Sequence, residues 1–180
     1  MTDPMAPLDR FTTARLRAER LRPAHLAEVR RMHRDPAVMR HLGGVRDAAG
    51  TTAYFERNLR HWRDHGFGLW IVYEREGSEP IGRAMLRWLR VDDVDELEVG
   101  YAFYEPYWRL GLASEVTLAC IALARRELSA ESFVALTAPA NQASQHVLTK
   151  AGFVYDRDFP LEDTMCRMYR YCVSASSANC

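Results

Sequence analysis

Several features common in other protein classes are missing from this sequence. No run of about 18 apolar residues occurs among its 180 residues, so no membrane span is predicted. Its first residues lack the apolar core of a secretory signal, and we expect a cytoplasmic protein. Net charge is zero, with 24 basic and 24 acidic side chains, so we expect neither a nucleic-acid nor a membrane-surface partner. Zero charge also favours self-association, which keeps a homodimer among the expected states.

Cysteines are few and are not grouped for chemistry. The four are Cys120, Cys166, Cys172 and Cys180. None belongs to a C-x-x-C pair or lies near a histidine at metal-ligand spacing, so we expect reduced thiols and no metal. The glycine turn in the middle of the chain carries neither a Walker signature nor G-x-G-x-x-G. Nucleotide hydrolysis and dinucleotide redox chemistry therefore lose support.

The residues that are present indicate a single α/β domain with a mixed sheet. Hydrophobic side chains make up 48% of the chain and charged ones 27%, as in an ordinary globular domain. We predict a flexible leader over residues 1–13, one domain over 14–173 and a flexible tail over 174–180. Patterning predicts strands at 15–21, 67–73, 80–91, 96–104, 132–137, 153–157 and 165–173. Helices are expected after Pro23, from a cap at Thr51-Thr52 to His65, up to Arg126, and over 141–151.

The most informative stretch runs from Glu96 to Glu115 and reads ELEVGYAFYEPYWRLGLASE. A predicted strand leads through a turn with Pro106 into a loop of small residues, and then directly into a helix. The free N–H groups of a helix N-terminus suit a phosphate. An ordinary strand-to-helix turn would show the same spacing, so both interpretations stay open at this point.

A second segment, from Asn141 to Phe153, reads NQASQHVLTKAGF. Asn141 suits a helix N-cap, and Gly152 suits the left-handed residue that ends a helix. Together with EVGYAFYEPYWRLGLASE, this segment resembles the GNAT superfamily of acetyl-CoA-dependent N-acetyltransferases, and within it the ribosomal-protein N-terminal acetyltransferase-like group. The N-terminal TARLRAERLRPAHLAEVRRMHRDPAVMRHLGG and the strand GFGLWIVYE fit that group too, so the likeness covers nearly the whole chain.

The resemblance implies a fold and a reaction. The fold would be a mixed, mostly antiparallel central sheet of about six to seven strands flanked by helices. The enzyme would move an acetyl group from acetyl-CoA to a primary amine by direct attack in a ternary complex. The amine could belong to a protein N-terminus or to a small molecule. A non-catalytic acyl-CoA-binding module of the same fold is the alternative.

The resemblance also assigns cofactor contacts by position. The family's phosphate loop matches Trp108 through Ala113, with Gly111 and Ala113 at its two small positions. Trp108 replaces the family's usual Gln or Arg, and Arg109 stands where the subgroup usually has glycine. Main-chain groups of residues 101–103 would pair with the pantetheine arm like an added strand. The implied cofactor-binding residues are Tyr101, Ala102, Phe103, Trp108, Arg109, Leu110, Gly111, Leu112, Ala113, Ser114 and Asn141.

Catalytic candidates come partly from the residues and partly from the family. Many members carry a tyrosine acid seven residues after the asparagine, but that position is Leu148 here. The subgroup then suggests Ser144 as the acid, although a polar helix start explains it equally well. Glu98 is our candidate base, because it shares a strand face with Gly100 and Ala102. A solvated acidic pair with Glu96 is the other reading. We expect the acceptor pocket between the 35–44 region and the 158–163 loop.

Overall fold

The protein is described by a computed structural model over residues 8–161 and 164–173. In chain order the elements are β1 (Arg10–Thr12), β2 (Leu16–Arg20), η1 (Pro23–His25), α1 (Leu26–Arg34), α2 (Pro36–Met39), α3 (Ala48–His65), β3 (Leu69–Glu74), β4 (Pro80–Val91), β5 (Val94–Phe103), η2 (Glu105–Tyr107), α4 (Leu112–Leu128), β6 (Ser132–Thr137), α5 (Gln142–Lys150), β7 (Val154–Leu161) and β8 (Thr164–Cys172).

The described strands form one eight-stranded sheet in the order β1-β2-β3-β4-β5-β6-β8-β7. Neighbours are antiparallel except β5 and β6, which are parallel. The mixed, mostly antiparallel sheet is confirmed, with one strand more than expected. That strand is β1. It lies inside the segment predicted to be a flexible leader, and it pairs with β2. Residues 1–7 and the predicted tail over 174–180 lie outside the described residues.

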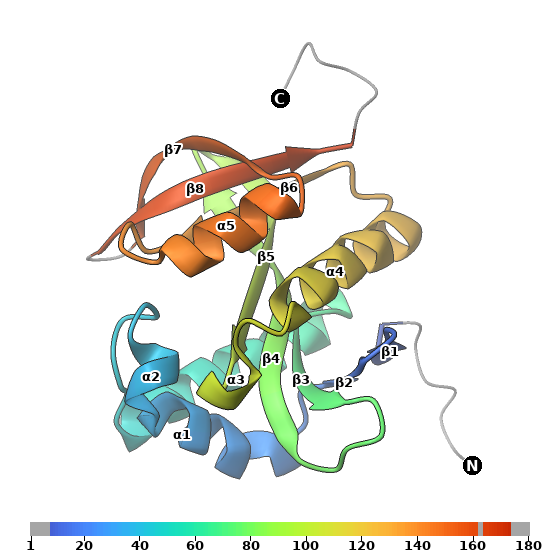
Figure 1. The fold of residues 1–180 in the computed structure, drawn as a ribbon, viewed down its shortest axis with the longest axis vertical. Coiled ribbons are helices and arrows are strands. Elements are labelled where there is room, and N and C mark those ends of the chain that lie inside the picture. Colours follow the sequence, from blue (N-terminus) through green and yellow to red (C-terminus); the bar gives the residue numbers. More distant parts are fainter. Residues whose placement is uncertain (1–7, 162–163, 174–180) are drawn as a thin grey trace.

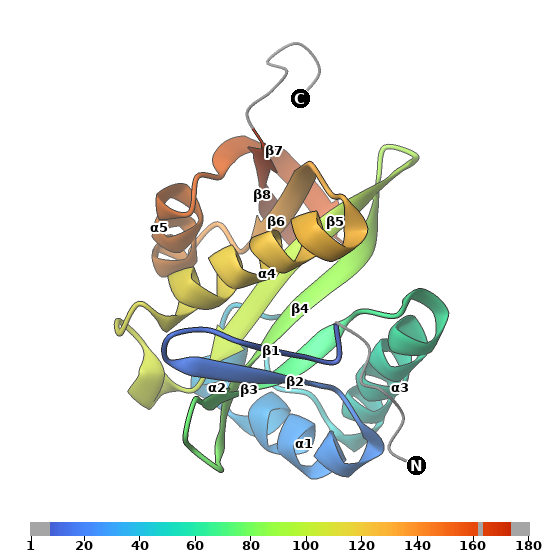
Figure 2. The same cartoon turned by 90° about the vertical axis from the view of Figure 1, so that its right-hand side faces the viewer.

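Helices cover the sheet in two groups. In Figure 1, α1, α2 and α3 gather at one end of the molecule, and α4 and α5 at the other. Turned by 90°, Figure 2 shows α4 lying across the sheet over β4 and β5. Side chains of β5 alternate between the groups: Ala102 packs with Met32 and Met39 of α1 and α2, whereas Val99 packs with Cys120 of α4. We call these the α1–α3 face and the α4 face of β5.

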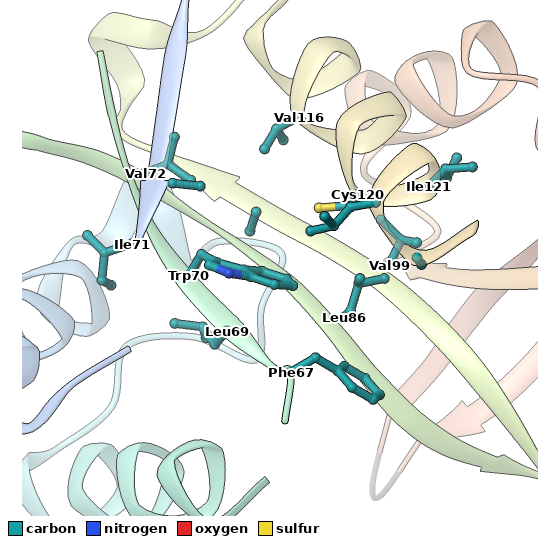
Figure 3. Packing of buried hydrophobic residues seen from close by; sticks show 14 of the residues in the cluster. Phe67, Leu69, Trp70, Ile71, Val72, Leu86, Val99, Val116, Cys120 and Ile121 are labelled. Atoms are coloured by element: carbon teal, nitrogen blue, oxygen red, sulfur yellow. The ribbon is translucent and has the colours of Figure 1, made fainter. Parts of the chain in front are cut away.

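The main core lies between α4 and the central strands. Figure 3 shows side chains of α4, among them Cys120, gathered with those of β3, β4 and β5. Trp70 and Cys120 are both 0% exposed. Trp62 closes the core from α3, where its indole N–H donates to the Leu69 carbonyl at 2.8 Å. No helix in the described part of the chain is long and apolar enough to cross a membrane.

The expected cap of α3 is wrong by one turn. The helix begins at Ala48, and the carboxylate of Asp47 accepts the Gly50 N–H at 2.7 Å. A carboxylate is an effective N-cap. Thr51 is instead buried inside the helix, where its hydroxyl lies 3.1 Å from Nδ1 of His33. The predicted helix end is confirmed, with Gly66 in the left-handed region at φ 74°.

The C-terminal strands also differ from expectation. Pro160 was expected between two strands but lies within β7, which continues to Leu161. Strand β7 lies at the edge of the sheet, where no further strand needs a backbone N–H, so a proline is tolerated there. The expected 158–163 loop is therefore strand as far as Leu161, and residues 162–163 lie outside the described residues. Cys120 and Cys166 are free, whereas Cys172 is disulfide-bonded, so the expectation of reduced thiols is wrong there.

Candidate active site

The sheet opens between β5 and β6. Their pairing consists of one register pair, Glu98 with Val134. Beyond it, among the described strands, residues 99–103 of β5 pair with β4 alone. The Tyr104 N–H donates to the Ile81 carbonyl of β4 at 3.0 Å. By the alternation of an antiparallel ladder, main-chain groups of Ala102 also face β4, whereas those of Tyr101 and Phe103 face the opening.

Three main-chain positions were expected to bind a cofactor. Two of them, Tyr101 and Phe103, face the opening, whereas Ala102 faces β4. The Phe103 carbonyl already accepts a hydrogen bond from the Trp108 indole N–H at 2.7 Å. Within the described part of the chain, the groups left unpaired on this edge are the Phe103 N–H and both main-chain groups of Tyr101. An extended ligand could pair with them as an added strand. Trp108 itself is 38% exposed and holds the loop against the end of β5.

The loop after β5 ends in a helix start that has no side-chain cap. Gly111 is the N-cap of α4 at φ 77°, and the Glu115 N–H is the one that bonds back to its carbonyl, at 3.1 Å. The N–H groups of Leu112, Ala113 and Ser114 are therefore left without intrahelical acceptors. They carry the positive end of a 17-residue helix. This arrangement suits an anion such as a diphosphate.

Arg109 adopts a backbone conformation that favours glycine. Its φ is 61°, within the left-handed region. For a residue with a Cβ this costs roughly 1 kcal/mol. Arg109 adds a positively charged residue to the loop that leads into the free N–H groups of α4.

One positioning residue was missed by sequence reasoning. Arg15, the residue before β2, donates from Nη1 to the Leu110 carbonyl at 2.7 Å and from Nε to the Glu115 carboxylate at 2.6 Å. Thr13 also donates to Glu115. Desolvation raises the pKa of Glu115, but the hydrogen bonds from Thr13 and Arg15 outweigh it and lower this pKa below its usual value. No local pattern links residues about 100 positions apart, so the sequence carries no signal for this contact.

Ser144 and Tyr101 meet on the α4 face of β5. The Ser144 N–H donates to Oδ1 of Asn141 at 3.1 Å, which fixes the first turn of α5. The Ser144 hydroxyl lies 2.9 Å from the Tyr101 hydroxyl. Burial raises the pKa of Tyr101 to about 12, so the phenol keeps its proton at neutral pH. Leu148, where many relatives have a tyrosine, is buried at 2% exposure.

Glu98 lies on the opposite, α1–α3 face, at the point where β5 and β6 separate. It is 5% exposed, and its carboxylate pairs with Arg87 across the β4–β5 ladder. Glu96 also has a partner, Arg170, at 2.7 Å. The reading of Glu96 and Glu98 as a solvated acidic pair is therefore wrong, because both carboxylates are covered and ion-paired.

The two catalytic candidates are thus separated by the strand. Glu98 faces one side of β5, and the Tyr101–Ser144 pair faces the other. Cys120 lies at 0% exposure, and burial raises the pKa of its thiol to about 12, so it cannot act as a nucleophile at the site. Among residues 8–161 and 164–173, no group of three His, Cys, Asp or Glu side chains could hold a metal ion.

Comparisons with known proteins agree with this geometry. A family profile described as an acetyltransferase (GNAT) domain matches residues 15–154. An uncharacterised Bacillus subtilis protein, YkkB, is 29% identical over 123 residues, which cover 68% of this chain and 72% of YkkB. The solved structure of an acetyltransferase from Agrobacterium tumefaciens matches with a TM-score of 0.80 and 25% identity, covering 95% of this chain and 98% of the other.

A further structural neighbour is RimL, a ribosomal L7/L12 α-N-protein acetyltransferase solved in complex with coenzyme A. Its TM-score is 0.72 at 16% identity, and the match covers 91% of this chain and 97% of RimL. At that identity the likeness is one of fold. The fold, the opening in the sheet and the profile match together show that this chain belongs to the GNAT acetyltransferase family.

Proposed function

We propose that this protein transfers an acetyl group from acetyl-CoA to a primary amine by direct attack within a ternary complex. The observation that carries the proposal is the continuous main-chain surface along one side of β5 and into α4. It combines strand-edge groups at Tyr101 and Phe103 with the free N–H groups of residues 112–114. An extended arm ending in a diphosphate is complementary to this surface: its amides can pair with the strand edge, and its phosphate oxygens can accept from the helix N–H groups.

The residues fit acetyl-CoA in two parts. The pantetheine amides would pair with Tyr101 and Phe103, with Asn141 near the other side of the opening. The diphosphate would lie against the loop from Trp108 to Ser114, where Arg109 adds a positive charge. Bound in this way, acetyl-CoA supplies the activated acyl group. The thioester would then lie near Glu98, where β5 and β6 separate.

Glu98 is the proposed base. An attacking amine has a pKa of roughly 8 to 10, so at neutral pH it must lose a proton. The carboxylate of Glu98 faces the α1–α3 side, from which the acceptor would approach. Arg87 occupies one of its oxygens, Oε2, and leaves the other to take a proton directly or through water. Positioned base catalysis of this kind contributes about 10²- to 10⁴-fold.

Ser144 is the proposed proton donor to the departing thiolate, on the α4 face. Its hydroxyl is held by the Tyr101 phenol, which can replace the proton that Ser144 gives up. The leaving thiol has a pKa of roughly 8.5, so protonation helps less here than base catalysis does. The tyrosine missing from position 148 is thus replaced by one from β5.

Thiol release from acetyl-CoA across a panel of amines tests the proposal. We expect turnover with at least one primary amine, and a loss in kcat of about 100-fold in Glu98→Gln. Glu96→Gln is the matched control: it lies two residues away, with its own arginine partner, and keeps activity near wild type. Cofactor binding without turnover of any amine would favour the non-catalytic acyl-CoA-binding module. A Glu98→Gln enzyme with unchanged kcat would remove Glu98 as the base.

A further inference from the structure

The α1–α3 face of the sheet contains a buried arginine that has no anionic partner in the described part of the chain. Arg83 of β4 is 7% exposed, and its Nε is buried without a hydrogen-bond acceptor among the described residues. Within those same residues, no carboxylate lies within ion-pairing distance of its guanidinium. Burying an unpaired charge costs several kcal/mol. Among the described residues, no carboxylate offsets that cost.

The surroundings of Arg83 add positive charge. Its guanidinium lies 5.7 Å from the centre of the Tyr54 ring, and that of Arg46 lies 5.0 Å from the same ring. The Tyr54 hydroxyl is also buried without a partner among the described residues. The contacts of Arg46 include Nε2 of His33, at 3.2 Å, and the Leu42 carbonyl, at 3.4 Å. Arg83 Nε and the Tyr54 hydroxyl are thus two buried donors near each other that an anion could satisfy.

The pKa of His33 is affected by the charges of this cluster of arginines around Tyr54. Burial, followed by the charges of Arg46 and Arg83, lowers the pKa of His33 to about 4. The imidazole is therefore neutral at physiological pH. Its Nδ1 lies 3.1 Å from the Thr51 hydroxyl, and its Nε2 faces Arg46, so it adds neither charge nor an anionic acceptor.

Arg83 lies on the side from which an acceptor would approach. It is the ladder partner of Ala102 and shares a face with Glu98. The four residues from Ala102 to Glu98 span about 13 Å of strand. The long side chains of Glu98 and Arg83 can take up roughly half of that span. An acceptor whose amine reaches Glu98 could then place a second group, about two residues or five to six bonds away, at Arg83.

We propose that Arg83, with the Tyr54 hydroxyl, forms an anion subsite that selects acceptors carrying a carboxylate at that distance from the reacting amine. This inference rests on the proposed acetyl transfer and names its substrate class. Polycationic acceptors are disfavoured, because a second ammonium would face the Arg83 guanidinium. The carboxylate could come from an acidic residue near a protein N-terminus or from a small amino acid, and the experiment separates these sources.

The test compares kcat/KM within two matched pairs of acceptors. One pair is Ala-Asp-amide and Ala-Asn-amide, and the other is 6-aminohexanoate and its amide. We expect the anionic member of at least one pair to be favoured by about 10- to 100-fold, as for a charge-assisted contact. A preference in the peptide pair alone indicates a protein N-terminus, and one in the second pair alone indicates a small acid. Equal values within both pairs would overturn the subsite while acetyl transfer stands.

Substitutions test whether a preference for the anionic acceptors depends on Arg83. Arg83→Met should reduce the ratio between the paired acceptors to below about 3-fold, whereas Arg60→Met, an exposed arginine of α3, should keep it. Tyr54→Phe removes only the hydroxyl and should reduce the ratio by a smaller factor, which keeps the test open if Arg83→Met does not fold. A full ratio in both folded variants contradicts the proposal.

A readout independent of turnover is calorimetry on the CoA-saturated protein with the acetylated products. N-acetyl-Ala-Asp-amide should bind about 10-fold more tightly than its Asn counterpart, or N-acetylated 6-aminohexanoate more tightly than its amide. If no amine is turned over, the proposed function fails, and this measurement alone decides the subsite. Equal affinities within both pairs would then overturn it.

Discussion

The two faces of β5 are built by different means. The α4 face and the opening beside it use main-chain groups: the strand edge at Tyr101 and Phe103, and the helix start after Gly111. The α1–α3 face uses side chains that are held in place by other side chains, such as Glu98 by Arg87. Main-chain groups do not depend on side-chain identity, so residues such as Trp108 and Arg109 can vary without removing them. A side-chain surface changes with every substitution, so this face is where members of one family can diverge.

The largest effect in testing this difference between the two faces is expected at Gly111, in the main-chain part of the site. In Gly111→Glu, a carboxylate would enter the anion site, and we expect acetyl-CoA affinity to fall more than about 100-fold. Calorimetry measures the loss. Gly66→Glu is the control, because Gly66 has nearly the same φ, 74° against 77°, and ends α3 far from the loop. Both variants carry a similar backbone strain of about 1 kcal/mol. Unchanged affinity in Gly111→Glu would contradict our placement of the diphosphate.

The α1–α3 face should show its side-chain construction in the pH dependence of stability. The pKa of His33 is about 4 when folded and 6.5 when unfolded, so the unfolded chain binds the extra proton between these values. Stability from neutral His33 is therefore full above pH 6.5 and is lost as the pH falls towards 4. The loss is on the order of 3 kcal/mol.

Chemical denaturation at pH 7 and pH 4.5 measures this term. His33→Gln should lose less stability between the two pH values than wild type. The control variant His41→Gln, in the loop after α2, should behave as wild type. Equal pH dependence in wild type and His33→Gln would mean that the cluster around Arg83 does not hold a neutral histidine.

A smaller effect is expected from the Tyr101–Ser144 pair, which is the side-chain part of the α4 face. Ser144→Ala should lower kcat about 10-fold, and Tyr101→Phe by a comparable or smaller factor. If the two act as one relay, the double variant loses little more than Ser144→Ala alone. Stopped-flow measurement of single turnovers supplies the rates. Fully multiplicative losses would separate the two residues.

The smallest effect is expected at Cys120, which belongs to the core rather than to either functional face. Cys120→Ala should keep kcat/KM within about twofold and cost about 1 kcal/mol of unfolding free energy. Thermal melting and steady-state rates measure both. A collapse of activity in a folded variant would instead indicate an acetyl-cysteine intermediate and a ping-pong reaction.

Much of the fold could be predicted from local patterns. The bounds of β4 and β6 agree with the predicted 80–91 and 132–137, because apolar and β-branched runs end at clear turn residues there. The loop at Gly111 and the cap at Asn141 were equally visible, since backbone requirements leave small or capping residues in the sequence. Strand β1 was not, because its three residues are ordered by pairing with β2 rather than by their own pattern.

The side-chain contacts of the α1–α3 face could not be predicted for a related reason. Alternation placed Glu98 on the correct face but could not reveal its pairing with Arg87. The meeting of Arg83, Tyr54 and His33 depends on how α1 and α3 pack on the sheet. These residues come from three separate elements, and none belongs to a motif. Tertiary packing, which local periodicity does not encode, decides what a buried side chain faces.

The contact between Arg15 and the loop after β5 has a consequence for the order of assembly. Arg15 is synthesised early, but its partners, Leu110 and Glu115, leave the ribosome about a hundred residues later. Bringing such distant segments together carries a loop-closure cost, so contacts of this kind form late in folding. The loop therefore gains its last support only once the first strands have joined the sheet. Affinity for coenzyme A, followed during refolding, would report completion of the whole domain.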